Sequence, residues 1–385
     1  MSIFCIVCEF DPLHNGHKYL LGRARELGAD KVVCVMSGNS TQRGGFSLID
    51  KYKRAEAAVK CGADLVLELP FPWSSASADY FATAAVSIAS GFCDTLLFGS
   101  ECGNIEMLSR AAELCESEDF KEKYVKRNAD GEGSASAYLG LLEEYGISGL
   151  SSNDILGIAY IRAIKRLDLD VTPVTVKREG ADFKNTEITP DAYQSATAIR
   201  ERLYADQSVD EYIPKPMSEI LKKEKEAGRI TDVSLMDSAV LSFFCLSAPE
   251  ELDGIADAGG GIANRLVSAA RESVSFEEMF SKARTKRYTD AKLRRAVLYC
   301  MTGTGTEDVR SMPEYTTLLA ANNAGRELLA ENRKSERAIK VVTKPADAPD
   351  VRQTRLSSKL DALYGLARES KQRADSFVKK NAYID

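Results

Sequence analysis

The chain has 385 residues, of which 44% are hydrophobic and 28% are charged, and its formal net charge is −6. This composition is that of an ordinary globular protein long enough for two domains, and it excludes disordered and collagen-like chains. A chain with a net negative charge has no global basic field, so any contact with a polyanion has to be local.

No run reaches the roughly 18 consecutive apolar residues that a membrane span requires, and the start, MSIFCIVCEF, lacks the basic segment of a secretory signal. The nine cysteines are scattered and odd in number, so we expect reduced thiols and a cytoplasmic protein without membrane contact. Cys5 and Cys8 form one C-x-x-C inside an apolar run. Because no second cysteine pair or distant histidine pair completes a zinc site, we expect them to pack in the core.

Between residues 4 and 100, short β-rich runs alternate with helical patterns. The expected strands are 4–10, 31–38, 64–70 and 94–100, and the expected helices between them are 17–28, 48–62 and 81–91. The strands are almost continuously apolar, and each connection is long enough for a helix. These features predict a Rossmann-like, doubly wound α/β fold with a parallel sheet covered on both faces.

Residues 104–166 have a helical pattern, residues 172–178 resemble one more strand, and a helix is expected at 195–203. After the turn at 213–216, helix follows helix, with one β-like run at 338–344. The sequence therefore predicts an α/β domain over residues 1–210 and a mainly α-helical domain over residues 211–385.

His14-Asn15-Gly16-His17 contains both histidines of the chain and follows the first expected strand. Ligands of such sheets bind where a strand hands over to a helix, and a helix N-terminus attracts phosphate through its N–H groups and dipole. Glycine lets a ligand approach the backbone, and two imidazoles three residues apart can donate to one anion whose charge grows in a transition state. The pattern favours nucleotidyl transfer.

Two other interpretations of these histidines stay open. They could be metal ligands, although a carboxylate such as Glu9 or Asp11 would have to complete the site. They could also be surface residues of a tight turn.

An H-x-G-H at this place resembles the signature of the nucleotidylyltransferase superfamily, whose second signature has the form ISSTxIR. The segment Ser195-Ala-Thr-Ala-Ile-Arg200 resembles that second signature. Ser195 and Thr197 can cap the helix and hold a phosphate, while Arg200 supplies a planar fork for phosphate oxygens. By itself this segment could equally be a capped helix with a surface arginine.

Further segments resemble one family of that superfamily, the tRNA(Met) cytidine acetate ligases. They are MSGNSTQRG at 36–44, DKYKRAEAA at 50–58, DLVLELPF at 64–71, SADYFATAAV at 77–86, LLFGSE at 96–101, NDILGIAY at 153–160 and VKREGA at 176–181. The family typically reads YNPFHNGH where this chain has FDPLHNGH.

The resemblance implies an ATP site along the first strand-to-helix turn and at four later positions. These residues are Val7, Cys8, Glu9, Phe10, Asp11, Pro12, Leu13, His14, Asn15, Gly16, His17, Lys18, Tyr19, Leu20, Gly99, Asn153, Arg178 and Ser195. Without the resemblance, Gly99 could merely end a strand, Asn153 could be a helix N-cap and Arg178 could be a solvated charge.

Two further features near the ends of the expected strands are each open to more than one interpretation. Gln42 and Arg43 follow the second strand, so they could form a lid or contact phosphate, although they could also be an ordinary polar loop. Trp73, the only tryptophan, could wall an acyl pocket, stack on a base or lie at the edge of the core.

The second half contains a local basic run between residues 282 and 295. Its cations are Lys282, Arg284, Lys286, Arg287, Lys292, Arg294 and Arg295, with Asp290 as the only acid. Such a run is a candidate contact for the tRNA backbone, with Tyr288 able to stack, or a solvated helix face. Gly259-Gly-Gly261 lacks the GK[ST] ending of a P-loop.

The resemblance implies a two-step ligase that uses ATP and Mg²⁺. Acetate is activated as acetyl-adenylate, and the acetyl group passes to N4 of the wobble cytidine of elongator tRNA(Met). His14, His17, Thr197 and Arg200 are the expected catalytic residues, and no protein-bound metal ion is expected. The alternatives are a small-molecule adenylyl- or cytidylyltransferase without an RNA substrate and a noncatalytic RNA-binding protein that keeps the nucleotide site.

Overall fold

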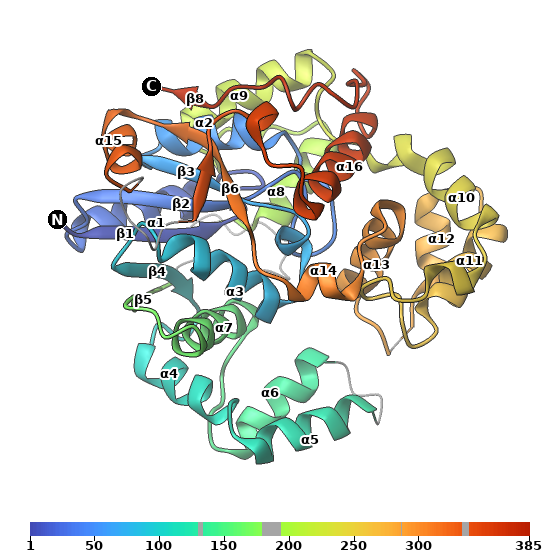
Figure 1. Cartoon of the computed structure of the whole chain (residues 1–385), viewed down its shortest axis with the longest axis horizontal. Helices are drawn as coiled ribbons and strands as arrows, with labels where there is room; N and C mark the ends of the chain where they lie inside the picture. The colour runs from blue at the N-terminus through green and yellow to red at the C-terminus, as the bar shows by residue number, and fades with distance from the viewer. Residues whose placement is uncertain (130–133, 179–193, 286, 333–338) are drawn as a thin grey trace.

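An eight-stranded sheet forms the centre of the molecule (Figure 1). The computed structural model describes residues 1–129, 134–178, 194–285, 287–332 and 339–385. The strand order is β5-β4-β1-β2-β3-β6-β7, with β8 paired to β6. The strands are β1 (Ile3–Cys8), β2 (Lys31–Ser37), β3 (Leu65–Leu69), β4 (Thr95–Ser100), β5 (Thr172–Lys177), β6 (Tyr315–Ala321), β7 (Lys340–Val342) and β8 (Tyr383–Ile384).

Strands β1 to β5 are mutually parallel, and helices cover both faces of the sheet, so the predicted doubly wound fold is confirmed. Alternate side chains of β2 show this arrangement. Val33 and Val35 pack on the face covered by α3, α4, α7 and α15 (Asn323–Asn332), whereas Cys34 packs on the face covered by α1, α2 and α9 (Lys215–Glu226). The helices of the first half are α1 (Asn15–Glu26), α2 (Lys51–Lys60), α3 (Ala78–Ala89), α4 (Ile105–Leu114), α5 (Glu118–Ala129), α6 (Ser134–Glu144), α7 (Ser152–Arg166) and α8 (Ala196–Tyr204).

The second half has more β-structure than its helical pattern predicts. Strand β6 pairs antiparallel with β3 and is buried along its whole length, and β7 and β8 pair with it. The run 338–344 does contain the expected strand, as β7, with residue 338 outside the described residues. The YTTLLAA of β6 escaped prediction because a short apolar run does not distinguish a buried strand from a buried helix segment. The division near residue 210 stays a prediction, since the sheet takes strands from both sides of it.

The helices of the second half fall into two groups. Helices α10 to α13 enclose a separate apolar core containing Phe244, Leu266, Met279 and Leu293, and α10 to α12 lie apart from the sheet (Figure 1). We call α10 to α13 the helical lobe. The helices are α9 (Lys215–Glu226), α10 (Asp237–Leu246), α11 (Ile262–Arg271), α12 (Phe276–Ala283), α13 (Asp290–Thr302), α14 (Thr306–Arg310), α15 (Asn323–Asn332) and α16 (Arg352–Leu366).

Short 3₁₀ turns complete the described structure, namely η1 (Trp73–Ser75), η2 (Val233–Met236), η3 (Pro249–Leu252) and η4 (Pro345–Asp347). In the part of the chain that the structure describes, no helix has the length and apolar character needed to cross a membrane.

Three residues with more than one interpretation in the sequence, Cys5, Cys8 and Trp73, are core residues. Cys5 and Cys8 lie on opposite faces of β1, each inside an apolar cluster, which confirms that they pack in the core. Trp73 is 2% exposed, and its indole N–H donates to the carbonyl of Ser311 at 2.7 Å. Because Trp73 is buried and its N–H is bonded to Ser311, we infer that it packs in the core.

A buried guanidinium joins the carboxyl ends of β1 and β2. Arg54 of α2 is 0% exposed, and its nitrogens donate to the carbonyls of Glu9, Ser37, Gly38 and Ile49. The Glu9 and Gly38 carbonyls lie just beyond β1 and β2, the Ser37 carbonyl belongs to the last residue of β2, and the Ile49 carbonyl lies just before α2. Arg54 therefore fixes the edge of the sheet from which the histidine turn starts.

Replacing Arg54 by methionine should lower the free energy of unfolding by about 3 kcal/mol or more, because several buried carbonyls lose their donor together. Denaturant unfolding of the variant measures this loss. The matched variant Arg110→Met, on the exposed surface of α4, should change stability by less than about 0.5 kcal/mol. Equal stabilities of the two variants would contradict the role of Arg54.

Candidate active site

The two histidines lie at the start of α1 and cap it reciprocally. His14 is the N-cap, and its Nδ1 accepts a hydrogen bond from the N–H of Gly16 at 3.1 Å. His17 Nδ1 accepts from the N–H of His14 at 3.3 Å. The two rings stack with their centroids 3.6 Å apart, and Phe10 packs edge-on against His17. The two imidazoles are thus held as one rigid unit.

This geometry determines the protonation state of both rings. Burial lowers the pKa of His14 to about 3, and repulsion by Arg178 adds to the shift. Burial also lowers the pKa of His17, with further contributions from His14 and Arg178. Because each Nδ1 accepts a hydrogen bond, the single proton of each neutral ring resides on Nε2. Both histidines therefore present a neutral Nε2–H donor at pH 7.

The first amides of α1 are less available than the sequence suggests. The N–H of Asn15 donates to the carbonyl of Tyr212, that of Gly16 to His14 Nδ1, and that of His17 to the carbonyl of His14. We expected free amides at this N-terminus to bind phosphate. The helix dipole remains, but the available donors at this turn are the imidazole Nε2–H groups.

Helix α8 brings the second motif to the same turn. Ser195 caps α8 by accepting from the N–H of Ala198 at 3.1 Å, as predicted. Arg200 donates to the Asp11 carbonyl at 2.6 Å and pairs with the Asp11 carboxylate at 3.2 Å. It also donates to the hydroxyl of Thr197 at 3.2 Å. Asp11 thus joins the two motifs, and its other oxygen accepts from the N–H of Leu48 at 2.6 Å.

A third group of predicted residues meets at the end of β4. The Nδ2 of Asn153 donates to Glu101, whose carboxylate also pairs with Arg178 at 3.4 Å. The stem of Arg178 crosses Gly99, where a Cβ would lie 3.1 Å from the Arg178 Cγ. Gly99 therefore makes room for Arg178, and the charge of Arg178 acts on both histidines. Sequence reasoning missed Glu101, which is the acceptor that unites this group.

Asn153 is not the helix N-cap that the sequence alone favoured. Helix α7 begins at Ser152 with Ser151 as its N-cap residue, and Asp154 accepts from the N–H of Ser151 at 2.8 Å. The capping task thus belongs to neighbours of Asn153, and its own amide is turned toward Glu101.

The loop after β2 reaches the same edge of the sheet, as expected. The N–H of Gln42 donates to the Glu9 carboxylate at 2.7 Å. Burial raises the pKa of Glu9, although Gln42 and the positive charge of Arg43 favour its ionised form. At Gly44, which has a φ of +76°, a Cβ would clash with the backbone N of Arg295, so this loop packs against α13 of the helical lobe.

The other predicted residues of the first turn have mixed environments. Cys8, Phe10, Pro12 and Leu13 are buried, so only their backbone is suited to meet a ligand. The rest are more open to solvent, with Lys18 exposed and the following residues half-buried: Val7, Asn15, Gly16, Tyr19 and Leu20.

The basic run of the second half divides into exposed and buried cations. Lys282, Arg284 and Arg287 are exposed, and Arg284 pairs with Asp290 at 2.6 Å. Lys292 and Arg294 are half-buried, whereas Arg295 is 11% exposed and pairs with Asp257 at 2.6 Å. Lys286 lies outside the described residues. The run is therefore not one uniform cationic face.

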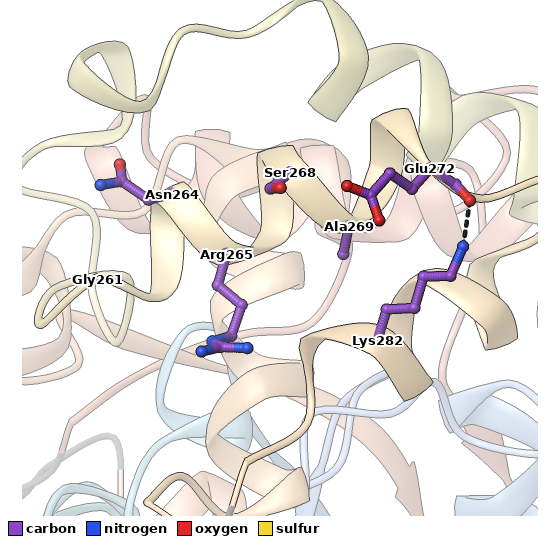
Figure 2. A pocket seen from close by; sticks show the side chains of 7 residues that line it. All are labelled: Gly261, Asn264, Arg265, Ser268, Ala269, Glu272 and Lys282. Atoms are coloured by element: carbon purple, nitrogen blue, oxygen red, sulfur yellow. Dashed lines mark hydrogen bonds between the residues drawn. The ribbon is translucent and has the colours of Figure 1, made fainter.

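A groove on the helical lobe begins at this basic run (Figure 2). Its volume is about 440 Å³, and the Nζ of Lys282 donates to the carbonyl of Glu272 at one side of it. Its lining residues are Gly261, Asn264, Arg265, Ser268, Ala269, Glu272 and Lys282. None of the histidine-turn residues lines this groove.

Comparisons with known proteins agree with this geometry. The family described as HIGH Nucleotidyl Transferase matches residues 1–377. The tRNA(Met) cytidine acetate ligase of Acetivibrio thermocellus is 34% identical over 372 residues, covering 90% of this chain and 89% of that protein. The enzyme of the same name from Caldicellulosiruptor bescii is 35% identical over 353 residues, covering 89% of this chain and 87% of that protein.

Solved structures give the same result. The structure of apo Thermotoga maritima TmcAL superposes with a TM-score of 0.91 at 29% identity, and both chains are covered completely. The form of that protein bound with alpha-thio ATP gives a TM-score of 0.88 at 29% identity, again with both chains covered completely. The chain therefore belongs to the HIGH nucleotidyl transferase family and, within it, to the tRNA(Met) cytidine acetate ligases, which confirms the predicted family.

Proposed function

We propose that this protein is an ATP-dependent ligase that acetylates N4 of the wobble cytidine of elongator tRNA(Met). An oxygen of acetate attacks the α-phosphorus of ATP, the bond to the β-phosphate breaks, and pyrophosphate leaves. The N4 amine of the cytidine then attacks the acetyl carbon, AMP leaves, and the amine gives up a proton. Since this tRNA works in the cytoplasm, the proposal places the reaction there.

The observation that carries the proposal is the rigid pair of neutral imidazoles at the β1–α1 turn, tied through Asp11 to Arg200. The relatives named tRNA(Met) cytidine acetate ligase and the related structure holding an ATP analogue support it. Acetate is poor at acylating an amine because its leaving group is poor. Adenylation supplies a good leaving group, and a site that stabilises charge on phosphorus is what that step requires.

Each proposed catalytic residue has a separate role in the first step. His14 and His17 donate from Nε2 to phosphate oxygens as negative charge grows on the pentacovalent phosphorus. Arg200 supplies a charged planar donor, and the hydroxyl of Thr197, which already accepts from Arg200, positions it. Arg178 and Asn153 bind the nucleotide at the adjacent strand end. No covalent enzyme intermediate is required.

Mg²⁺ fits the site as an ion carried by the nucleotide. Among the described residues, no three potential ligand side chains gather into a metal site, and Glu9 and Asp11 already accept from Gln42 and Leu48. Mg²⁺ is commonly held by substrate phosphates with few protein ligands. When bound to ATP, it neutralises phosphate charge, and the protein needs to bind only the resulting complex.

RNA is proposed to reach the site across the helical lobe. The exposed cations Lys282, Arg284 and Arg287 suit contacts to phosphate, and Lys292 lies 5.6 Å from the ring centroid of Tyr288, a candidate stacking residue. The contact of Gly44 with α13 joins this lobe to the loop beside Glu9, so bound RNA would lie near the adenylate.

The proposed function is tested by acetate-dependent ATP–pyrophosphate exchange, followed by nucleoside mass analysis of unmodified elongator tRNA(Met). N4-acetylcytidine that requires both ATP and acetate is the expected result. Exchange without acetylation of the RNA would instead indicate a small-molecule transferase, and ATP binding without exchange would indicate a noncatalytic protein.

Replacing His17 by alanine should lower the acetate-dependent exchange rate about 10²- to 10³-fold, because one donor to the transition state is lost. Glu26→Gln, at the exposed end of the same helix, is the matched control and should keep the wild-type rate. His17→Asn separates chemistry from folding, since its side chain can still accept from the N–H of His14. An exchange rate close to wild type in both His17 variants would refute the assignment.

The low pKa values predict a defined pH dependence. An unfolded histidine takes up a proton below about pH 6.5, whereas folded His14 stays neutral down to about pH 3. Acidification from pH 7 to pH 5 should therefore lower the free energy of unfolding by about 2 kcal/mol through His14. NMR of ¹⁵N-labelled histidine, with only two residues to assign, should show both rings as neutral Nε2–H tautomers at pH 6. A titration near pH 6.5 would contradict this account.

The division of the basic run predicts opposite phenotypes for two arginines. Arg287→Ala should weaken tRNA binding and reduce its salt dependence by about one phosphate contact, with exchange in the absence of RNA unchanged. Arg295→Met should instead lower thermal stability, because it leaves Asp257 without its partner. Filter binding at several salt concentrations and thermal melting measure the two effects. Identical salt slopes for wild type and Arg287→Ala would remove Arg287 from the proposed RNA surface.

A further inference from the structure

Glu101 lies at the centre of the group of residues at the end of β4. It follows β4 directly, and one of its oxygens, Oε1, accepts from Asn153 Nδ2 at 2.5 Å and pairs with Arg178 Nε at 3.4 Å. These partners come from α7 and from the end of β5, elements that lie beside β4 (Figure 1). One carboxylate oxygen therefore ties together two segments that are distant in sequence.

The second oxygen of this carboxylate lacks a donor. Oε2 of Glu101 is buried and has no hydrogen-bond partner among the described residues. A buried carboxylate oxygen without a donor is costly, and such atoms in a folded protein usually await a ligand, water or ion. The side chain as a whole is 25% exposed, so a donor from outside can reach it after a small rotation of the terminal torsion, which is soft.

The charge of Glu101 restricts what that donor can be. Strand β4 neighbours β1, so Glu101 lies one strand away from the histidine turn where the phosphates are proposed to bind. A carboxylate repels phosphate oxygens, which have no proton to donate at pH 7. The part of ATP that it faces must therefore carry an N–H or O–H group. The ribose hydroxyls and the exocyclic amine of adenine are the groups of ATP that meet this requirement.

The neighbours of Glu101 preorganise it for this contact. Arg178 and Asn153 hold one oxygen, and the absence of a side chain at Gly99 lets the stem of Arg178 lie flat across β4. The Arg178 backbone N–H also donates to the Ser100 carbonyl at 2.9 Å, which fixes the approach of this residue. A fixed acceptor loses little freedom when a ligand arrives, and this favours recognition.

We infer that Glu101 is a further nucleotide-binding residue, which accepts a hydrogen bond from a neutral donor of the nucleoside half of ATP while it positions Arg178 and Asn153. This inference rests on the proposed ATP-dependent function. It assigns to the end of β4 the recognition of the nucleoside and leaves charge stabilisation to the histidine turn.

The test is equilibrium binding of nucleotides, measured by titration calorimetry on the full chain without acetate or RNA. Wild type, Glu101→Gln and the matched control Glu106→Gln, an exposed residue of α4, are each titrated with ATP. The same proteins are titrated with 2′-deoxy-ATP, 3′-deoxy-ATP and inosine triphosphate, which each remove one candidate donor. Pairing a protein change with a ligand change isolates the direct contact from effects on folding.

Glu101→Gln should bind ATP about tenfold or more weakly than wild type, because a neutral amide replaces the charged acceptor, and Glu106→Gln should bind like wild type. Wild type should also bind one analogue weakly, and Glu101→Gln should discriminate against that analogue much less. If the analogue that wild type binds weakly is a deoxy analogue, the donor to Glu101 is the ribose hydroxyl that this analogue lacks. If the analogue that wild type binds weakly is inosine triphosphate, the donor is the exocyclic amine of adenine. The base of inosine has a carbonyl in place of that amine, and this carbonyl would face the carboxylate.

Two results would overturn the inference. If Glu101→Gln binds ATP as tightly as wild type, Glu101 has no role in the site. If Glu101→Gln lowers the affinity for ATP and for all three analogues by the same factor, Glu101 acts only through Arg178 and Asn153. The direct contact with the nucleoside is then refuted. Failure of the proposed function is recognised separately, because wild type would then show no acetate-dependent exchange whatever its nucleotide preference.

Discussion

The buried guanidinium of Arg54 is the constraint on which the site depends. It binds the carbonyls of Glu9 and Gly38, just beyond the ends of the neighbouring parallel strands β1 and β2, and Glu9 lies five residues before the first histidine. A parallel sheet leaves such carbonyls without partners at its carboxyl edge. A charged donor from α2 satisfies several of them together, and this fixes where the chain turns into α1.

The charges of the site are arranged around this turn. The two imidazoles are neutral and their Nδ1 atoms are occupied, so each offers one directed donor. The strongly charged donors are kept separate, and each has its own carboxylate: Asp11 holds Arg200, and Glu101 holds Arg178. The site is therefore close to electrical balance before any ligand binds. A polyanion can then compete for guanidiniums that are already oriented, which reduces the reorganisation needed during reaction.

The sequence predicted the parts of this arrangement that depend on local pattern. Apolar runs and helix lengths gave the parallel strands β1 to β5, the histidine turn fell at the first strand-to-helix junction, and Ser195 proved to cap α8. Family resemblance supplied Gly99, Asn153 and Arg178, which the structure brings to one strand end. Such features are readable because they are set within one or two turns of chain.

What escaped prediction depends on contacts between distant segments. Asp11 and Arg200 are separated by 189 residues, and nothing near Glu101 in the sequence distinguishes it from a surface acid. Strand β6 was missed because its neighbour, β3, lies some 250 residues earlier, so its burial has no local signal. The basic run looked uniform because sequence does not show that Arg295 turns inward to Asp257.

The central claim is that acetate becomes covalently joined to the α-phosphate before the acetyl group moves. Acetate labelled with ¹⁸O in both oxygens tests it, with unmodified elongator tRNA(Met) as acceptor and mass spectrometry of the released nucleotide. The proposed path leaves one labelled oxygen on AMP, because the bond that breaks in the second step is that between the acetyl carbon and the oxygen from acetate. Unlabelled AMP formed together with N4-acetylcytidine, or ADP in its place, would contradict the adenylate mechanism.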